Sequence, residues 1–296
     1  MNVKSILVVI KKTKYELDTS LFQDMEFYKK ICKIQNNSFD RIYESHLRQI
    51  ESRTYLQKIL KDAVFIFREG LESINLKKFT IVVSLGGDNH FTYVAHHCKK
   101  IKILGCNSDT KTSYGALLSF NPETLEETVR KNWKNTQVEK WSLISSEILY
   151  PNGSTTHTVN AVSEISIRNT IPDLTSRYVI INGSELEEQK SSGILLYTGA
   201  GSTGWYASCK SDEDEPIRFS KSEKFFKVYS RELSRKARQR FKFTDFEVKN
   251  TISVISEMNG GISIDALAER VYPFPAGSIA KFSLAKEKLS VVTLKN

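Results

Sequence analysis

The chain has 296 residues, of which 40% are hydrophobic, and a formal net charge of +9. This length predicts one large or two ordinary domains, and no apolar run is long enough to cross a membrane. The four cysteines show no CxxC pairing, which argues against a disulfide framework and against a cysteine metal centre. The first residues do not have the pattern of a signal or transit peptide, so we expect a cytoplasmic protein with no membrane partner.

The excess of positive charge has two interpretations. It fits a nucleic-acid partner, but the basic residues are spread along the chain, with one local cluster at 231–242. A generally positive surface also suits a polyanionic small substrate such as a nucleotide. We therefore expect no nucleic-acid partner. The acidic stretch at 211–215 is interpreted as a solvated loop.

The first part of the chain alternates apolar strands with amphipathic helices. This order predicts a mostly parallel, doubly wound α/β sheet. A later helix, over 122–133, has Pro122 near its start and acids in its early turns, which suits the helix dipole. The strands are predicted at 3–10, 63–67, 79–85 and 101–106, and the helices at 17–34, 39–60 and 89–98.

After about residue 138 the pattern becomes β-rich. Turn signals at 151–153 (PNG) and 182–183 (NG) favour hairpins. We therefore predict an α/β domain over 1–120 and a mostly antiparallel, β-rich domain over 121–296. The strands expected in the second part are 143–149, 155–167, 177–181, 194–198, 241–248, 251–256, 278–284 and 289–294.

The stretch 79–92, FTIVVSLGGDNHFT, is the first candidate site. A buried strand that ends in Gly86 and Gly87 and leads into a helix is typical of a phosphate site. Asp88 then stands at the carboxyl end of a strand, where α/β sheets bind ligands. A carboxylate there suits proton acceptance from a hydroxyl, or contact with phosphate through Mg²⁺. The alternative is a tight turn in which Asp88 caps the helix. His90 is expected at the surface or in a cap.

The loop 198–206, TGAGSTGWY, is the second candidate. Its glycines allow a ligand to approach the backbone, and its hydroxyls can bond phosphate or ribose. Trp205 can stack on a base. The alternative is a flexible loop with an exposed tryptophan. The apolar run before it indicates that this loop also opens from the end of a strand.

Three blocks occur in the order found in one enzyme family: GGDN at 86–89, AVSEISIR at 161–168 and SSGILLYTGAGSTGWYAS at 191–208. Together they resemble the NAD kinase family over residues 79–292. QKSSG at 189–193 and TGAGSTGW at 198–205 are most similar to its mitochondrial-type branch. The resemblance implies an NAD kinase-like fold, in which an α/β domain precedes a β-rich domain.

The resemblance also implies an activity, the transfer of the γ-phosphoryl group of ATP to the 2′-hydroxyl of the adenosine ribose of NAD, which gives NADP. Asp88 is implied as the proton acceptor, Mg²⁺ as an ion carried by ATP without protein ligands, and a homodimer or higher homo-oligomer as the assembly. The implied NAD-binding residues are Gly87, Asp88, Asn89, Ser163, Glu164, Ser192, Thr203, Gly204, Trp205 and Ser208. The implied ATP- or phosphate-binding residues are Gly86, Gly87, Gly199, Gly201 and Ser202.

The sequence departs from the family pattern at three of these positions. Asn89 replaces a glycine, Ser163 replaces an asparagine, and Ser192 replaces the acid of many members. Ser192 is usual in the mitochondrial-type branch, but Asn89 and Ser163 make a catalytically degenerate NAD(P)-binding regulatory protein an alternative. A diacylglycerol- or sphingosine-type lipid kinase is a weaker one, against which the 198–205 block argues. The sequence decides neither between ATP, another nucleotide and polyphosphate as the donor nor between NAD and NADH.

Overall fold

The computed structural model describes residues 5–22, 24–210, 216–233 and 239–295. The chain forms two compact units, Met1–Glu139 together with Ser290–Asn296, and Lys140–Leu289. The first unit extends past the predicted boundary at residue 120 because helix α5 (Pro122–Arg130) packs onto its sheet through Leu125. The acidic stretch 211–215 and the middle of the basic cluster 231–242 lie outside the described residues.

The first unit is built on a six-stranded sheet with the order β2-β1-β3-β4-β18-β5. The β1–β2, β1–β3, β3–β4 and β4–β18 pairs are parallel, which confirms the predicted parallel α/β architecture. The last strand thus returns to the sheet that the first strand begins. The strands are β1 (Ile6–Ile10), β2 (Val64–Phe67), β3 (Ile81–Gly86), β4 (Lys102–Asn107), β5 (Thr136–Trp141) and β18 (Leu289–Leu294).

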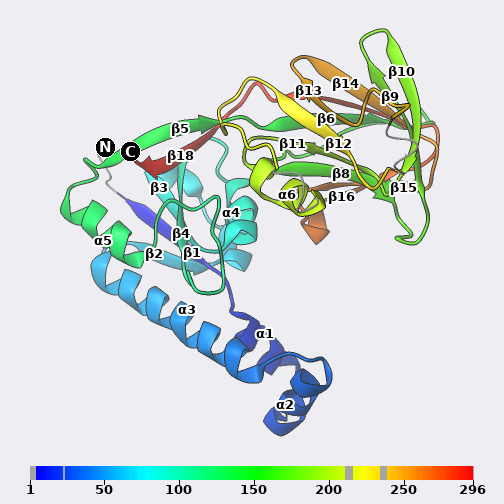
Figure 1. The fold of residues 1–296 in the computed structure, drawn as a ribbon. Helices are drawn as coiled ribbons and strands as arrows, with labels where there is room; N and C mark the ends of the chain where they lie inside the picture. The colour runs from blue at the N-terminus through cyan, green and yellow to red at the C-terminus, as the bar shows by residue number, and fades with distance from the viewer. Residues whose placement is uncertain (1–4, 23, 211–215, 234–238, 296) are drawn as a thin grey trace. The chain divides into compact units, whose positions relative to one another are not determined.

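Helices cover both faces of this sheet, which is why β3 is buried along its whole length. Val83 and Leu85 face a core formed with α3 and α5, and α4 lies against the opposite face (Figure 1). No helix in the described part of the chain is both long and apolar enough to span a membrane. Besides α5, the helices of this unit are α1 (Lys14–Leu21), α2 (Met25–Ile34), α3 (Phe39–Ile59), α4 (Asp88–Ala95), η1 (Arg68–Ser73) and η2 (Leu76–Lys78).

The prediction of a single helix over 17–34 is wrong. The segment forms two helices, because Asp24 begins a new one by accepting a hydrogen bond from the backbone N–H of Glu26 at 2.9 Å. Figure 1 shows α1 and α2 as a short pair beside one end of the long α3. The pair packs against α3 through aromatic rings. The ring centroids of Tyr15 and of Tyr43 on α3 are 5.1 Å apart.

The second unit contains two six-stranded sheets, ordered β10-β9-β14-β17-β6-β7 and β13-β12-β11-β8-β15-β16. The neighbours within each sheet pair antiparallel, as the β-rich pattern predicted. The strands are β6 (Ile144–Leu149), β7 (Thr155–His157), β8 (Glu164–Asn169), β9 (Ser176–Asn182), β10 (Glu185–Ser191), β11 (Ile194–Tyr197), β12 (Phe226–Ser230), β13 (Asp245–Val248), β14 (Thr251–Ser256), β15 (Gly260–Ile264), β16 (Val271–Phe274) and β17 (Ile279–Leu284); the short helices are η3 (Gly201–Thr203), α6 (Trp205–Cys209) and η4 (Ala268–Arg270).

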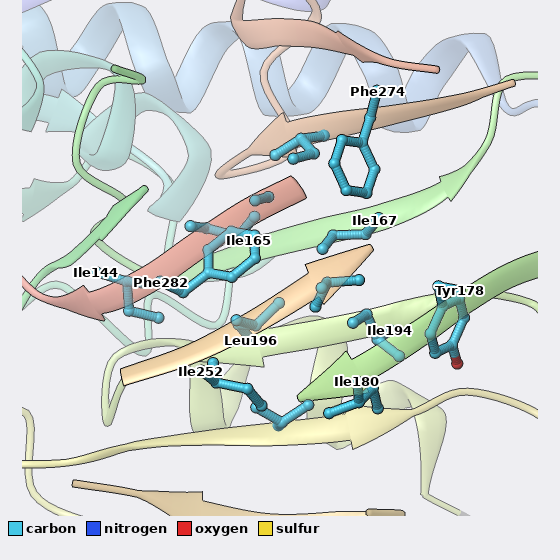
Figure 2. Packing of buried hydrophobic residues seen from close by; sticks show 14 of the residues in the cluster. Ile144, Ile165, Ile167, Tyr178, Ile180, Ile194, Leu196, Ile252, Phe274 and Phe282 are labelled. Carbon is cyan, nitrogen blue, oxygen red and sulfur yellow. The ribbon is translucent and has the colours of Figure 1, made fainter. Parts of the chain in front are cut away.

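The core of this unit lies between the two sheets. Alternate residues of each strand point into it, and Figure 2 shows Ile165 and Ile167 of β8 gathered with Ile194 and Leu196 of β11. The side chain of Glu164 therefore projects from the other face of β8. The prediction of one strand over 155–167 is wrong, since β7 ends at His157 and β8 begins at Glu164.

Candidate functional site

Asp88 is the first residue of helix α4, directly after the Gly86 end of β3 and the N-cap residue Gly87. Its carboxylate does not cap the helix. Instead, it accepts hydrogen bonds from the backbone N–H groups of Ala116 at 3.1 Å and Leu117 at 2.9 Å. The helix-cap interpretation is therefore wrong. Each carboxylate oxygen keeps a further lone pair that can accept a hydrogen bond.

The two glycines make room for neighbouring side chains of the first unit. A Cβ at Gly86 would lie 2.7 Å from the His90 ring, and one at Gly87 would lie 3.0 Å from Ser113 Oγ. His90 is buried, and its Nε2 donates to the carbonyl of Val9 at 3.1 Å. Burial lowers the pKa of His90 to about 4, so the ring is neutral. The expected surface or cap role of His90 is wrong.

The loop that holds Asp88 is itself anchored to α3. Asp109, just after β4, receives hydrogen bonds from Arg48 Nε at 2.8 Å and Ser45 Oγ at 2.6 Å. Burial opposes ionisation of Asp109, but the bonds from Arg48, Ser45 and Thr112 outweigh it and lower its pKa to about 2. Asn107 joins this network by accepting from the N–H of Asp109 and donating to the Ser113 carbonyl. The sequence had not predicted this support.

In the second unit, Glu164 begins β8 beside a buried aspartate that the sequence analysis missed. The Asp265 carboxylate accepts backbone N–H bonds from Val162 at 2.9 Å, Ser163 at 2.7 Å and Glu164 at 3.0 Å. Burial, and then the negative charge of Asp265, raise the pKa of Glu164 to about 8. Glu164 is therefore mostly protonated at pH 7. The signal for Asp265 is a lone acid in the apolar run 262–268 (ISIDALA).

The loop 198–206 packs against this pair. Thr198 Oγ1 donates to the Val162 carbonyl at 2.6 Å and accepts the N–H of Ala200 at 3.1 Å. A Cβ at Gly199 would lie 2.2 Å from the Ser220 carbonyl oxygen, and one at Gly201 would lie 2.3 Å from that of Ser163. These two glycines are thus required by packing inside the unit, and their contact with phosphate stays a prediction.

The part of the loop around Thr203 and Gly204 is more accessible than the residues before it. Ser202 is fully buried, with its hydroxyl donating to the Gly199 carbonyl at 2.7 Å. Thr203 is half-buried, and Gly204 and Ser208 are exposed. A Cβ at Gly204 would lie 3.5 Å from Glu164 Oε2, so the exposed part of the loop borders the Glu164 carboxyl group.

Trp205 is half-buried and forms a stack with a second residue that the sequence analysis missed. The guanidinium group of Arg231 lies over the indole ring at 4.5 Å. The backbone carbonyl of Arg231 accepts a hydrogen bond of 3.2 Å from the N–H of Ser192. The Ser192 hydroxyl in turn donates to the carboxylate of Glu232. The second unit therefore brings Ser192 close to the Trp205 loop through Arg231.

A cavity of about 360 Å³ opens beside Trp205 on this face of the sheet. Ser166 and Arg168 of β8 and Ser263 of β15 line it together with Trp205. Ser166 and Arg168 alternate with the core residues of β8 and therefore share the face of Glu164. A flat ring can enter next to the indole, on a surface that also offers hydroxyl groups and a cation.

No group of three or more His, Cys, Asp or Glu residues that could hold a metal ion occurs among the residues the structure describes. Asp88, the acid at the strand end, has both oxygens bonded to backbone N–H groups. Asp265 and Glu164 are unsuited to a cation as well, because three backbone N–H groups bond the Asp265 carboxylate and Glu164 favours its protonated form. Asp88, Asp265 and Glu164 are therefore not gathered in such a group.

Comparison with protein-family models found no match to this chain, and comparison with curated protein sequences found none either. Solved structures do match it, among them the following two. An NAD kinase from Archaeoglobus fulgidus in complex with ATP is 21% identical, with a TM-score of 0.60 over 98% of this chain and 94% of the other. A yeast NADH kinase complexed with NADH is 11% identical, with a TM-score of 0.67 over 100% and 85%.

These similarities confirm the expected NAD kinase-like fold, an α/β unit and an antiparallel β-rich unit. At 21% and 11% identity they establish the fold, and the activity has to be argued from the residues of this chain. The assignment to the mitochondrial-type branch stays a prediction.

Proposed function

We propose that this protein is an ATP-dependent NAD kinase, which transfers the γ-phosphoryl group of ATP to the 2′-hydroxyl of the adenosine ribose of NAD and so produces NADP. The observation that carries the proposal is the carboxylate of Asp88, fixed by Ala116 and Leu117 at the carboxyl end of β3, in a fold shared with an NAD kinase and an NADH kinase.

Asp88 is proposed as the proton acceptor. Phosphoryl transfer depends mainly on alignment and on neutralised charge, and a hydroxyl nucleophile gains from an acceptor within hydrogen-bond reach. The two N–H bonds hold the Asp88 carboxylate in one orientation, and its remaining lone pairs are available to the 2′-hydroxyl. As the O–P bond forms, the hydroxyl proton passes to Asp88 and ADP leaves with the electrons of the broken P–O bond.

The second unit is proposed to hold the dinucleotide. Because the pKa of Glu164 is about 8, its carboxyl group can donate a hydrogen bond to a ring nitrogen or a ribose oxygen at neutral pH. The Arg231 guanidinium group lies over the Trp205 ring, and the cavity that Trp205 lines is proposed to take a base. Thr203, Gly204, Ser208, Ser163 and Ser192 complete the proposed NAD contacts. Asn89 is proposed as an NAD contact in the first unit.

Several further features belong to the proposal. Gly86, Gly87, Gly199, Gly201 and Ser202 are proposed to lie near the ATP phosphates. Mg²⁺ is proposed as the ion that accompanies ATP and neutralises its phosphates. A homo-oligomer and a cytoplasmic location are retained from the sequence analysis, and light scattering of the purified protein tests the first of these.

The proposal is tested by incubating the purified protein with ATP, Mg²⁺ and either NAD or NADH and measuring the phosphorylated product by mass spectrometry. We expect a product with NAD, and the ratio of the two rates decides which dinucleotide is preferred. Replacing ATP by other nucleotides or by polyphosphate decides the donor. Binding of NAD without a product under any donor would contradict the kinase and support the regulatory alternative.

The regulatory alternative rests on two substitutions, Asn89 and Ser163. The backbone N–H of Ser163 donates to Asp265 at 2.7 Å, and its side chain offers one hydroxyl where asparagine would offer a longer amide with both donors and an acceptor. If the wild-type protein binds NAD but is inactive, the Ser163→Asn variant, alone and with Asn89→Gly, should gain activity. If neither variant gains activity, these substitutions do not explain an inactive protein.

A further inference from the structure

Two cations lie at the edge of the first unit's sheet where Gly86 ends β3. Lys11 follows the last residue of β1, and Arg68 follows the last residue of β2. Ile10 pairs with Phe67 on one side and with Leu85 on the other, so Lys11 stands in register between Arg68 and Gly86. The carboxyl edge of a parallel sheet is where α/β folds bind their ligands.

Both side chains belong to the face of the sheet that α4 covers. Lys11 continues the alternation of Val9, whose carbonyl accepts the bond from His90 of α4. The guanidinium group of Arg68 lies 4.9 Å from the ring of Tyr93, also on α4. The two cations are therefore placed beside α4, on the face of the sheet that carries His90 and Tyr93.

The charge of this cluster is poorly compensated. In the described part of the chain, no carboxylate pairs with Lys11, and Arg68 has a single, half-exposed ion pair of 3.6 Å with its neighbour Glu69. The nearby Glu16 is already engaged by Arg53 at 3.3 Å. Burial, and then the charge of Arg68, lower the pKa of Lys11, which means that the cation lies in an unfavourable environment.

A buried polar atom also lacks a partner here. His90 uses Nε2 for the Val9 carbonyl, and its Nδ1 is buried without a hydrogen bond. The ring is neutral and leaves the positive charge of Lys11 and Arg68 unopposed. Two like charges placed side by side are costly alone and favourable around a polyanion.

We propose that Lys11 and Arg68 bind the phosphate chain of the phosphoryl donor at the carboxyl edge of the sheet, beside Gly86 and Gly87. The role as a donor site rests on the proposed kinase function, whereas the binding of a bare polyphosphate follows from the cluster alone. The planar guanidinium group of Arg68 fits phosphate oxygens. Lys11, which stands between Arg68 and Gly86 at the end of the strands, supplies a compact positive charge. The two residues are positioning residues, and Asp88 remains the proton acceptor.

Calorimetry with inorganic tripolyphosphate at low salt tests this site without relying on catalysis. We expect the wild-type protein to bind, and Lys11→Met and Arg68→Gln each to weaken binding by about 10- to 100-fold, the usual range for a hydrogen bond to a charged group. Lys12→Met is the matched control, because Lys12 is the exposed neighbour of Lys11 and loses the same charge. It should bind nearly as well as the wild type.

A kinetic measurement distinguishes weaker binding of the donor from a general loss of activity. In both variants the KM for ATP should rise while the KM for NAD stays within about threefold, because the lost contacts are to phosphate. If the wild type makes no NADP, the kinase proposal fails, and the calorimetry still decides whether the cations form a polyphosphate site. Failure of the wild type to bind tripolyphosphate, unchanged binding in both variants, or an equal loss in Lys12→Met would overturn the inference.

Discussion

The carboxylate of Asp88 accepts a hydrogen bond of 2.9 Å from the backbone N–H of Leu117, a residue 29 positions later in the chain. The acid at the strand end is thus held by the loop that follows the neighbouring strand. That loop is fixed in turn by Asp109, which Arg48 and Ser45 bind from α3. The orientation of the proposed proton acceptor therefore depends on residues that take no part in the chemistry.

Replacing Asp88 by asparagine should abolish turnover and leave NAD binding nearly intact. The amide cannot accept a proton at neutral pH, and its NH₂ group faces one of the two N–H donors. We expect a stability loss of about 1–2 kcal/mol from the broken bond. Urea unfolding and calorimetry with NAD give the two controls. Full turnover in this variant would show that another group accepts the proton.

The Glu164 carboxyl group should make stability depend on pH. Its folded-state pKa of about 8 lies above its ordinary value of 4.5, so the folded chain keeps a proton that the unfolded chain releases. The free energy of unfolding should therefore fall as the pH rises from about 4.5 to 8, by at most about 5 kcal/mol. Urea unfolding across this range measures it. The fall should be much smaller in Glu164→Gln, and equal curves for the two proteins would contradict the assignment.

Replacing Asp265 should destabilise the second unit. Its carboxylate binds three backbone N–H groups and its φ is +52°, a conformation that asparagine tolerates better than alanine. We expect a loss of about 1–3 kcal/mol for Asp265→Asn and a larger loss for Asp265→Ala. The asparagine variant should also lower the pKa of Glu164, because one negative neighbour is gone. The fall in the free energy of unfolding with rising pH should then be complete at a lower pH. A shift in the opposite direction would disprove the coupling.

Two glycines of the 198–206 loop should respond differently to alanine. A Cβ at Gly201 would lie 2.3 Å from the Ser163 carbonyl oxygen, whereas one at Gly204 would make ordinary contacts at 3.5 Å. We expect Gly201→Ala to cost at least about 2 kcal/mol, since backbone must move, and Gly204→Ala to cost less than about 1 kcal/mol. Thermal unfolding of the two variants compares them directly. Equal melting temperatures would contradict this packing.

Regular patterns allowed much of the fold to be predicted from the sequence. The alternation of Thr251–Ser256 matches β14 at both ends, because one of its faces packs in the core and the other does not. The hairpin at 182–183 is confirmed by the pairing of Asn182 with Glu185. The strand Gly260–Ile264 was missed because glycine is a poor strand former, and its place is set by pairing with β8.

The candidate site was harder to predict, since its contacts join residues distant in sequence. Asp88 and Glu164 were singled out from local motifs, but Asp265 and Arg231 lie far along the chain from the residues they hold. The glycine pattern was also ambiguous. Gly201 looks like part of a phosphate loop in the sequence, whereas the structure explains it by the approach of the Ser163 carbonyl.

The central claim is that this chain moves a phosphoryl group from ATP to the 2′-hydroxyl of NAD with Asp88 as the proton acceptor. Incubation of the wild type and Asp88→Asn with NAD and γ-³²P-labelled ATP, followed by identification of the labelled position by enzymatic digestion, tests it most directly. The account predicts label on the 2′-oxygen of the adenosine ribose with the wild type and none with the variant. Absence of label from NAD in the wild type, or equal labelling by both proteins, would contradict it.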